Sequence, residues 1–478
     1  MVRLAKNMFA PINQLSPEIL SIIPEYCGTD KELIELTHVC HGWREIFISH
    51  ASLWAVLDCR KLSKTHTYLN RSKGSPLEIC LEAPFLNAAL LLTIPHIGRL
   101  RALTFSGSPH QLLKLTEHFG YPAPLLRKLD LFVRGTSTAP IRVLFNGELP
   151  SLHDLHLASV VTDLPWESLS NLTTLNLYKV PNNITQFLNL FEQAPLLCEV
   201  VLTDSLPDIS DASAELVVSL PNLELLDITT EPAPSVLLNH LHIPAGAMVS
   251  LGFKFSGETS PILDSLPKSF DNFSNLSHIT SIHFELRQTI AMGFKGPNGG
   301  LYMVGSLIEG DPISSTLDHQ IHLSLDRFHL STVEKLMITN YTDSDSLEST
   351  SQALLLMSNL HTLTLVNSAN LSFISALNPN YNSLNTVACP RLEGLILWIR
   401  ALEEFHIKDL LEMAEQRASK GAKLSMVVIN CEHELVPAGD VLDLRRYVSH
   451  VEYKLEDWFP TWDVVPSRIH ELDDDNDW

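Results

Sequence analysis

The segment 126-LRKLDL-131 carries leucine at its first, fourth and sixth positions, and this spacing recurs along most of the chain. The same pattern stands at 152-LHDLHL-157, 172-LTTLNL-177 and 360-LHTLTL-365. With related apolar residues allowed, further copies begin at Leu100, Leu197, Leu223, Met248, Ile279, Val333, Leu392, Leu424 and Val448. Because side chains alternate across a strand, the fourth and sixth positions share one face, which we expect to be buried.

The spacing of these copies is typical of leucine-rich repeats, which recur about every 20 to 29 residues. Successive starts are 20 to 32 residues apart, except for 54 residues from Ile279 to Val333, where we expect a degenerate copy. Apolar, helix-like segments such as 184–191 and 212–220 lie between copies, and Pro, Ser or Asn often precedes the first leucine. The predicted fold class is therefore α/β: a curved solenoid over 81–465, with parallel strands on its concave face and helices and loops outside.

We call the pattern L-x-x-L-x-L the template. The residues between its leucines should line the concave sheet face. Those that we predict to bind a target protein are Lys128, Asp130, Phe132, Asp154, His156, Asn176, Tyr178, Glu199 and Asp227. His283, Glu285, Lys335 and Trp398 are expected on the same face. Acidic, amide and aromatic groups on a rigid sheet suit a protein segment of basic character. The alternative is that this mixture is simply a solvated face.

Composition and charge limit the class of partner. The chain has 478 residues, of which 45% are hydrophobic, and its 33 Lys+Arg against 55 Asp+Glu give a net charge of -22. Such a charge repels polyanions, so we expect neither nucleic acid nor an anionic membrane as partner, but another protein. The first 80 residues hold nine basic and eight acidic residues, or +1, which leaves 24 minus 47, or -23, for the rest. Two regions with different roles are indicated, divided near 73–76.

Three short helices are predicted before that boundary. Ser16 is a suitable N-cap and Pro17 suits the first helical position, while Pro24 should end this helix. A second helix should follow the capping box that runs from Thr29 to Glu32 and continue through Phe47, and a third should begin near Ser52. Three helices in so few residues make a small core, so part of their apolar surface should meet a partner or dock on the rest of the chain.

The segment 37-THVCHGWREIF-47 suggests a metal or thiol site at first sight. On a helical wheel, however, Cys40 shares the apolar side with Val39 and Trp43, whereas His38 and His41 lie opposite, so the three cannot converge on one ion. The seven cysteines never stand in the C-x-x-C spacing, and no apolar run reaches the length of a membrane span. We therefore expect reduced thiols, no metal or other cofactor, and a cytoplasmic and/or nuclear protein.

Four stretches of the N-terminal region form a recognisable set: 12-INQLSPEIL-20, 33-LIELTHVCHGWR-44, 52-SLW-54 and 68-YLNRSKGSPL-77. With them, the segment resembles an F-box of the kind found in fungal, basidiomycete-type F-box proteins. The resemblance implies an F-box over 11–58 after a flexible N-terminus at 1–10, then a connecting helix and first strand at 59–80. An acidic tail at 466–478 would follow the solenoid.

The same resemblance implies that the F-box binds a Skp-type adaptor, and through it a cullin, in a ubiquitin ligase whose target is held by the repeats. The residues implied to form or support the adaptor-binding face are Leu15, Pro17, Ile19, Leu20, Leu36, Val39, Trp43, Leu53 and Trp54. One departure concerns the end of the first helix. The family usually has an aromatic residue and a leucine there, whereas this chain has Pro24, Tyr26 and Cys27.

Catalysis by the chain itself is not expected, because no P-loop, G-x-G-x-x-G, H-E-x-x-H or G-x-S-x-G motif is present. One rival hypothesis is a leucine-rich-repeat scaffold without a ubiquitin ligase, in which the N-terminal helices only cap the solenoid. The other is an enzyme with an unusual site at Asp154, His156 and Asn176.

Overall fold

The computed structural model describes most of the chain. The described residues are 11–26, 30–82, 86–135, 139–141, 144–162, 168–181, 183–206, 216–230, 234–255, 265–286, 289–307, 327–339, 347–366, 372–381, 386–401, 404–433, 441 and 443–455. The proposed flexible N-terminus and the acidic tail lie outside them. The chain divides into two compact units, Met1–Pro181 and Asn182–Trp478, which we describe separately.

Unit 1 is built on a parallel sheet. Its strands are β1 (Val56–Asp58), β2 (Leu77–Glu82), β3 (Leu100–Gly107), β4 (Lys128–Val133), β6 (Asp154–Ala158) and β8 (Thr174–Tyr178). Each pairs in parallel with the next along the chain. The leucines at the fourth and sixth template positions, such as Leu129 and Leu131, are fully buried. The repeat pattern thus forms the predicted parallel strands. Two further strands of the sheet, β1 and β2, precede the first copy of the pattern, and β1 lies within the segment 11–58 assigned to the F-box.

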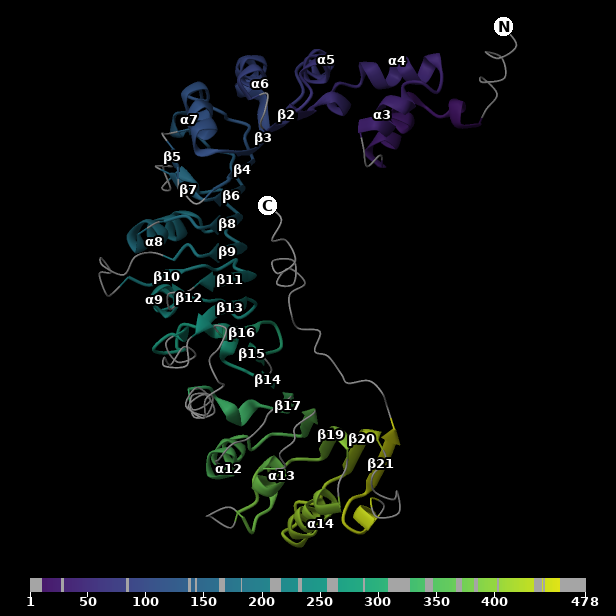
Figure 1. The fold of residues 1–478 in the computed structure, drawn as a ribbon, viewed down its shortest axis with the longest axis vertical. Helices are drawn as coiled ribbons and strands as arrows, with labels where there is room; N and C mark the ends of the chain where they lie inside the picture. Colours follow the sequence, from purple (N-terminus) through teal and green to yellow (C-terminus); the bar gives the residue numbers. More distant parts are fainter. Residues whose placement is uncertain are drawn as a thin grey trace. The chain divides into compact units, whose positions relative to one another are not determined.

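Helices join most of these strands and lie along one side of the sheet (Figure 1). They are α5 (Leu62–Ser72), α6 (Leu86–Thr93), η4 (Ile94–Arg99), α7 (Pro109–His118) and η5 (Leu144–Gly147). Short strands β5 (Ala139–Ile141) and β7 (Val160–Thr162) pair with each other. Helix α7 shows how the sequence dictates a start: Ser108 and Gln111 form a capping box and Pro109 takes the first helical position. In the described part of unit 1 the helices that join these strands leave the opposite side of the sheet uncovered, and we call that side the open face (Figure 1).

The N-terminal helices are more broken than predicted. They are η1 (Pro11–Gln14), α2 (Pro17–Ile22), η2 (Ile23–Tyr26), α3 (Asp30–Leu36), α4 (His41–Ser49) and η3 (Ala51–Trp54). The predicted second helix is wrong as a continuous element, because Thr37, His38 and Val39 form turns and Cys40 is the extended N-cap of α4. No helix among the described residues is long and apolar enough to cross a membrane.

Unit 2 begins and ends with parallel strands but differs in its middle. Strands β9 (Glu199–Thr203), β11 (Leu225–Thr230) and β13 (Met248–Phe255) are parallel neighbours. So are β17 (Lys335–Thr339), β18 (Thr362–Val366), β19 (Gly394–Ala401), β20 (Met426–His433) and β21 (His450–Leu455). Its helices are α8 (Ile184–Gln193), α9 (Ser235–Leu238), η8 (Ser274–Leu276), η9 (Leu330–Thr332), α12 (Leu347–Leu356), α13 (Ser372–Leu377), α14 (Glu404–Ser419) and η10 (Asp443–Arg446).

Between these parallel groups lies an antiparallel meander of β14 (Ser281–Leu286), β15 (Thr289–Lys295) and β16 (Gly300–Leu307). Its order is reversed, because β16 pairs in parallel with β13 while β14 pairs in parallel with β17. The prediction of one degenerate repeat in the 54-residue interval is therefore wrong. Two strands from that interval, β15 and β16, enter the sheet instead, and β15 runs against the others.

Two further sequence predictions need correction in unit 2. The leucine pattern predicts Met248 at the first position, but Met248 pairs with Leu225, which is the third residue of its own copy of the pattern. Met248 therefore stands on the open face. The helix-like segment 212–220 contains strand β10 (Val218–Ser219), paired with β12 (Leu241–His242), rather than a helix in its described part. The segment 184–191 does form a helix, α8.

A row of side-chain hydrogen bonds explains why Ser or Asn precedes the first template leucine. In each case the side chain donates to the backbone carbonyl of the residue two positions before the first leucine of the preceding repeat. The pairs are Ser151 to Pro124 at 2.7 Å, Asn171 to Pro150 at 2.7 Å, Asn222 to Pro195 at 2.8 Å and Asn359 to Ser331 at 2.6 Å. This polar ladder occurs in both units and fastens successive repeats at the entrance to the strand.

Candidate functional sites

The N-terminal helices carry apolar side chains on the outside. Their core consists of Leu20, Trp43 and Phe47, with the two aromatic rings 5.4 Å apart and perpendicular. A second group of apolar side chains is 39 to 55% exposed: Ile12, Leu15, Ile19, Ile22, Ile34 and Val39. We call this group the N-terminal apolar surface. Tyr26 is even more exposed, at 86%. Exposed apolar groups at this density in a short segment are typical of an interaction surface.

Both tryptophans of this region are covered by the chain itself. Trp43 donates from Nε1 to Asn13 Oδ1 at 2.7 Å. Trp54 is fully buried, donates from Nε1 to the Phe47 carbonyl at 2.8 Å, and packs perpendicular to Tyr68 of α5 at 4.9 Å. Arg71 lies 4.4 Å above the same indole. Of the alternatives left open by the sequence, docking on the rest of the chain therefore holds for Trp54.

The other residues implied in adaptor binding divide by exposure. Leu15, Pro17, Ile19 and Val39 are exposed, Leu36 and Leu53 are half-buried against the helical core, and Leu20 belongs to that core.

The histidines and cysteine of 37–47 do not form a metal site. Cys40 is half-buried against the helical core, while His41 points to Glu45, 3.5 Å away on the exposed side of α4. Within the described ranges no three His, Cys, Asp or Glu side chains gather as a metal site would require.

The open face of the sheet in unit 1 is arranged in three rows across the strands. Strand register places Glu78, Ala102, Lys128, Asp154 and Thr174 in the first row. The second row is Asp58, Cys80, Thr104, Asp130, His156 and Asn176. The third is Glu82, Ser106, Phe132, Ala158 and Tyr178. Seven of the nine residues predicted to bind a target lie on this face, in unit 1.

Asp130 is the centre of the second row. Its Oδ1 lies 3.1 Å from His156 Nδ1, its Oδ2 accepts from Thr104 Oγ1 at 3.1 Å, and Lys128 Nζ is 3.3 Å away. Burial would raise the pKa of this carboxyl, but hydrogen bonding and charge from His156 and Lys128 outweigh it and lower the pKa. His156 is thus paired with Asp130, not with Asp154, and the nearby Thr104 hydroxyl is engaged by the same carboxylate.

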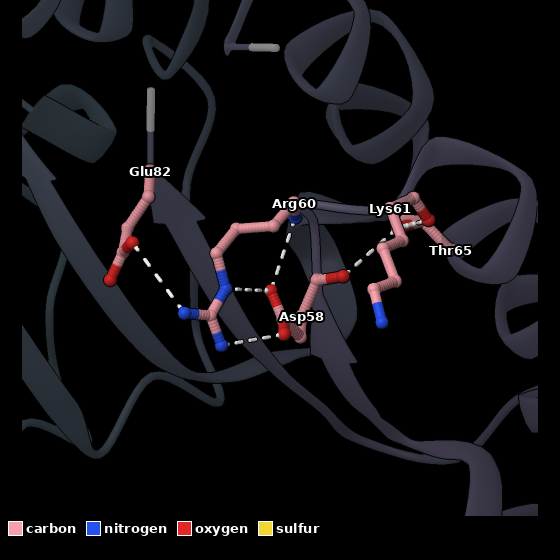
Figure 2. A network of polar contacts seen from close by, with 5 residues as sticks. All are labelled: Asp58, Arg60, Lys61, Thr65 and Glu82. Carbon is pink, nitrogen blue, oxygen red and sulfur yellow. Dashed lines mark hydrogen bonds and ion pairs between the residues drawn. The ribbon is translucent and has the colours of Figure 1, made fainter. Parts of the chain in front are cut away.

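A second polar network lies at the first two strands, as Figure 2 shows. Arg60 Nε and Nη2 donate to the two oxygens of Asp58 at 2.9 and 2.8 Å, and Arg60 Nη1 lies 3.9 Å from Glu82 on β2. Hydrogen bonding from Arg60 lowers the pKa of Asp58. Arg101 similarly lies 3.7 Å from Glu78. The contacts of Arg60 with Glu82 and of Arg101 with Glu78 were missed from the sequence, because only the register between strands brings these residues together.

The β6 and β8 part of the face has fewer internal contacts. Asp154 and Asn176 make no side-chain hydrogen bond or ion pair with the described residues, and His156 uses only the nitrogen that faces Asp130. Phe132 and Tyr178 are each 40% exposed. The Tyr178 ring is in contact with Lys179, whose Nζ lies 4.9 Å from the ring centroid. The side chains that the described residues leave without a polar partner here are therefore those of Asp154 and Asn176.

The predicted face residues of unit 2 are less accessible. His283 is buried and its Nε2 lies 3.1 Å from Thr339 Oγ1, while Glu199, Asp227, Glu285 and Trp398 are half-buried and Lys335 is exposed. Burial raises the pKa of Asp227 to about 6, against hydrogen bonding from Thr229 and Ser250. All of them alternate with buried template residues, as predicted.

Comparison with known proteins adds little to this description. No family model matches the sequence, and no curated protein does. Among solved structures, a leucine-rich repeat protein of Leptospira interrogans is similar over 77% of this chain and 91% of its own, with 16% identity and a TM-score of 0.25. So low a score carries no argument. The repeat architecture therefore rests on the strand order and register of this chain.

Proposed function

We propose that this chain is a non-catalytic substrate-recruiting subunit of a ubiquitin ligase in the cytoplasm or nucleus. In this proposal the N-terminal helices act as an F-box that binds a Skp-type adaptor, and through it a cullin. The repeats hold a target protein on the open face of unit 1. Holding the target raises the effective concentration of its lysines near the ubiquitin carrier.

The observation that carries the proposal is the N-terminal apolar surface. Six aliphatic side chains remain exposed on a segment that already has its own core of Leu20, Trp43 and Phe47. Burying apolar surface contributes about 25 cal/mol per Å², so such a surface favours association with a partner of similar character. The covered tryptophans take a supporting role: Trp43 holds the helices together, and Trp54 fixes them to α5.

The test uses two substitutions on the N-terminal apolar surface. Leu15→Ser with Ile19→Ser should abolish capture of a purified Skp-type adaptor, while the circular dichroism spectrum stays unchanged, since both side chains are exposed. Leu91→Ser is the matched control, because Leu91 is 70% exposed on α6, away from the N-terminal helices. Adaptor capture that survives the double substitution, or that is equally lost in the control, contradicts the proposal.

A second candidate function is a repeat scaffold outside any ubiquitin ligase, whose N-terminal helices cap the sheet. The packing of Trp54 against Tyr68 and Arg71 favours it, since this contact joins the helices to the first repeat. Under this alternative no Skp-type adaptor binds, and serine substitutions at Leu15 and Ile19 leave partner capture unchanged.

A further inference from the structure

Two exposed aromatic side chains stand on either side of a small residue in the third row of unit 1. Register places Phe132 of β4 next to Ala158 of β6, and Ala158 next to Tyr178 of β8. Neighbouring strands are about 4.8 Å apart, so the two aromatic residues originate about 10 Å from each other. Ala158 leaves the space between the rings unfilled by its own side chain. We call the place over Ala158, between Phe132 and Tyr178, the slot, and take it as the seat of one apolar side chain.

The same strand carries a carboxylate without a cation. The face has five carboxylates, those of Asp58, Glu78, Glu82, Asp130 and Asp154. Three cations, Arg60, Arg101 and Lys128, each lie within 4 Å of one of the first four carboxylates. A fourth cation, Lys179, lies over the Tyr178 ring, with its Nζ 4.9 Å from the ring centroid. Asp154 has no cationic partner among the described residues. A cationic group on a ligand would complete the charge pairing of this face.

The distance between these two features fits an extended chain. Asp154 and Ala158 are four residues apart on β6, or about 13 Å at about 3.3 Å per residue. Between them lie the outer edge of His156 and the amide of Asn176, neither of which hydrogen-bonds there to the described residues. Both side chains can hydrogen-bond to a peptide backbone. The Asp130 contact holds the His156 ring in place.

We infer that the β4, β6 and β8 part of this face binds an extended protein segment with one arginine or lysine and, about four residues away, one aliphatic or aromatic side chain. The cation pairs with Asp154 and the apolar side chain enters the slot between Phe132 and Tyr178. This inference deepens the proposed function, on whose target-binding role for this face it rests.

The experiment measures binding of short labelled peptides to the full-length protein by fluorescence anisotropy. The probe is fluorescein-labelled Ser-Gly-Arg-Ser-Thr-Ser-Leu-Gly-Ser, used together with its reversed sequence because either chain direction fits the face. Two variants of the probe replace arginine by glutamate or leucine by serine. We expect the wild-type protein to bind the arginine peptide at least about tenfold more tightly than the glutamate peptide, a difference of about 1.4 kcal/mol.

Protein variants then assign the two contacts. Asp154→Lys should reverse the preference, so that the glutamate peptide binds more tightly. Phe132→Ala with Tyr178→Ala should remove the preference for leucine over serine but keep that for arginine. Glu78→Gln is the control, since Glu78 lies on the same face but is already paired with Arg101, and it should bind like the wild type. An unchanged preference in Asp154→Lys, or no binding of either peptide direction at about 1 mM, overturns the inference.

Adaptor capture by the Asp154→Lys protein separates this inference from the proposed function. Capture should match that of the wild type, because Asp154 lies on the sheet rather than on the N-terminal helices. A protein that shows the charge reversal but captures no adaptor supports the inference and contradicts the ubiquitin ligase proposal. A protein that captures the adaptor but shows no charge reversal supports the ubiquitin ligase proposal and contradicts the inference.

Discussion

Asp130 in unit 1 and Asp227 in unit 2 occupy the same position of their repeats, between the fourth and sixth template residues, yet their carboxyls behave in opposite ways. Neighbouring His156 and Lys128 lower the pKa of Asp130 despite its burial. Asp227 accepts hydrogen bonds from the hydroxyls of Thr229 and Ser250, but burial outweighs them and raises its pKa to about 6. The position within the repeat places a side chain on the open face, but the adjacent strands decide its charge.

The largest expected effect should be the same in both units, because the packing beneath the two aspartates is alike. Leu129 and Leu226 hold the fourth template position next to Asp130 and Asp227, and both are fully buried. Leu129→Ala and Leu226→Ala should each cost about 2 to 5 kcal/mol of unfolding free energy. Hydrogen exchange of the strand peptides, read by mass spectrometry, measures each unit separately. A loss in one unit only would show that the two cores are not equivalent.

The second effect should distinguish the units. Asp130→Asn should destabilise unit 1 by about 1 to 3 kcal/mol at neutral pH, because it leaves His156 and Lys128 without their carboxylate. Since the folded pKa of Asp130 is lowered, its stabilisation is present above the unfolded pKa of about 3.9 and is lost as the pH falls below it. Denaturation curves between pH 7 and pH 3 test this. Asp154→Asn, which removes an unpaired carboxylate, should stay within about 0.5 kcal/mol.

Asp227→Asn should have a smaller effect of opposite sign. The raised pKa means that Asp227 favours the folded state below its unfolded pKa of about 3.9, and that this advantage is lost as the pH rises through about 6. Asparagine cannot ionise, so the variant should be more stable than the wild type at pH 8 by up to about 1 kcal/mol. The difference should be smaller or reversed at pH 4. Equal differences at both pH values would refute ionisation of Asp227 as the cause.

The smallest expected effect concerns the polar ladder, which both units share. Asn171→Ala in unit 1 and Asn222→Ala in unit 2 each remove one hydrogen bond between successive repeats, to Pro150 and Pro195 respectively. Because both side chains are exposed, each loss should be about 0.5 to 1 kcal/mol. Asn176→Ala in unit 1 removes an amide without such a contact and serves as the control. Urea denaturation of the three variants should separate the first two from the third.

The sequence predicted the regular part of this fold well, because the leucine spacing reports directly on alternation in a strand. Twelve of the thirteen template starts are in phase with the observed register, and only Met248 is displaced, by two residues. The pattern did not predict strands β15 and β16. Their buried residues, such as Phe294, Leu301 and Met303, do not follow the spacing of the template. A period of two residues alone does not reveal strand direction.

The candidate sites were predictable only in part. The alternation placed Asp130, His156 and Tyr178 on the open face. Which residues pair across strands depends on register, and His156 pairs with Asp130, not with Asp154. The helical wheel failed for Val39, which is 55% exposed, because it assumed one continuous helix where the chain makes turns at 37–40. Its placement of Cys40 on the packed side agrees with the structure. For Trp54, the covering residues Tyr68 and Arg71 lie in α5, and residue composition cannot show that contact.

The reversed meander of unit 2 has a consequence for how the chain assembles during synthesis. Within the parallel groups on either side of the meander a new strand finds its neighbour soon after it is made: Leu225 of β11 and Met248 of β13, for example, are 23 residues apart. The free edge of β13, however, must wait for β16, since Met248 pairs with Gly300, 52 residues later. Closing longer loops slows strand pairing. Growth of the sheet should therefore pause at β13, and resume only when the ribosome has released residues beyond 307.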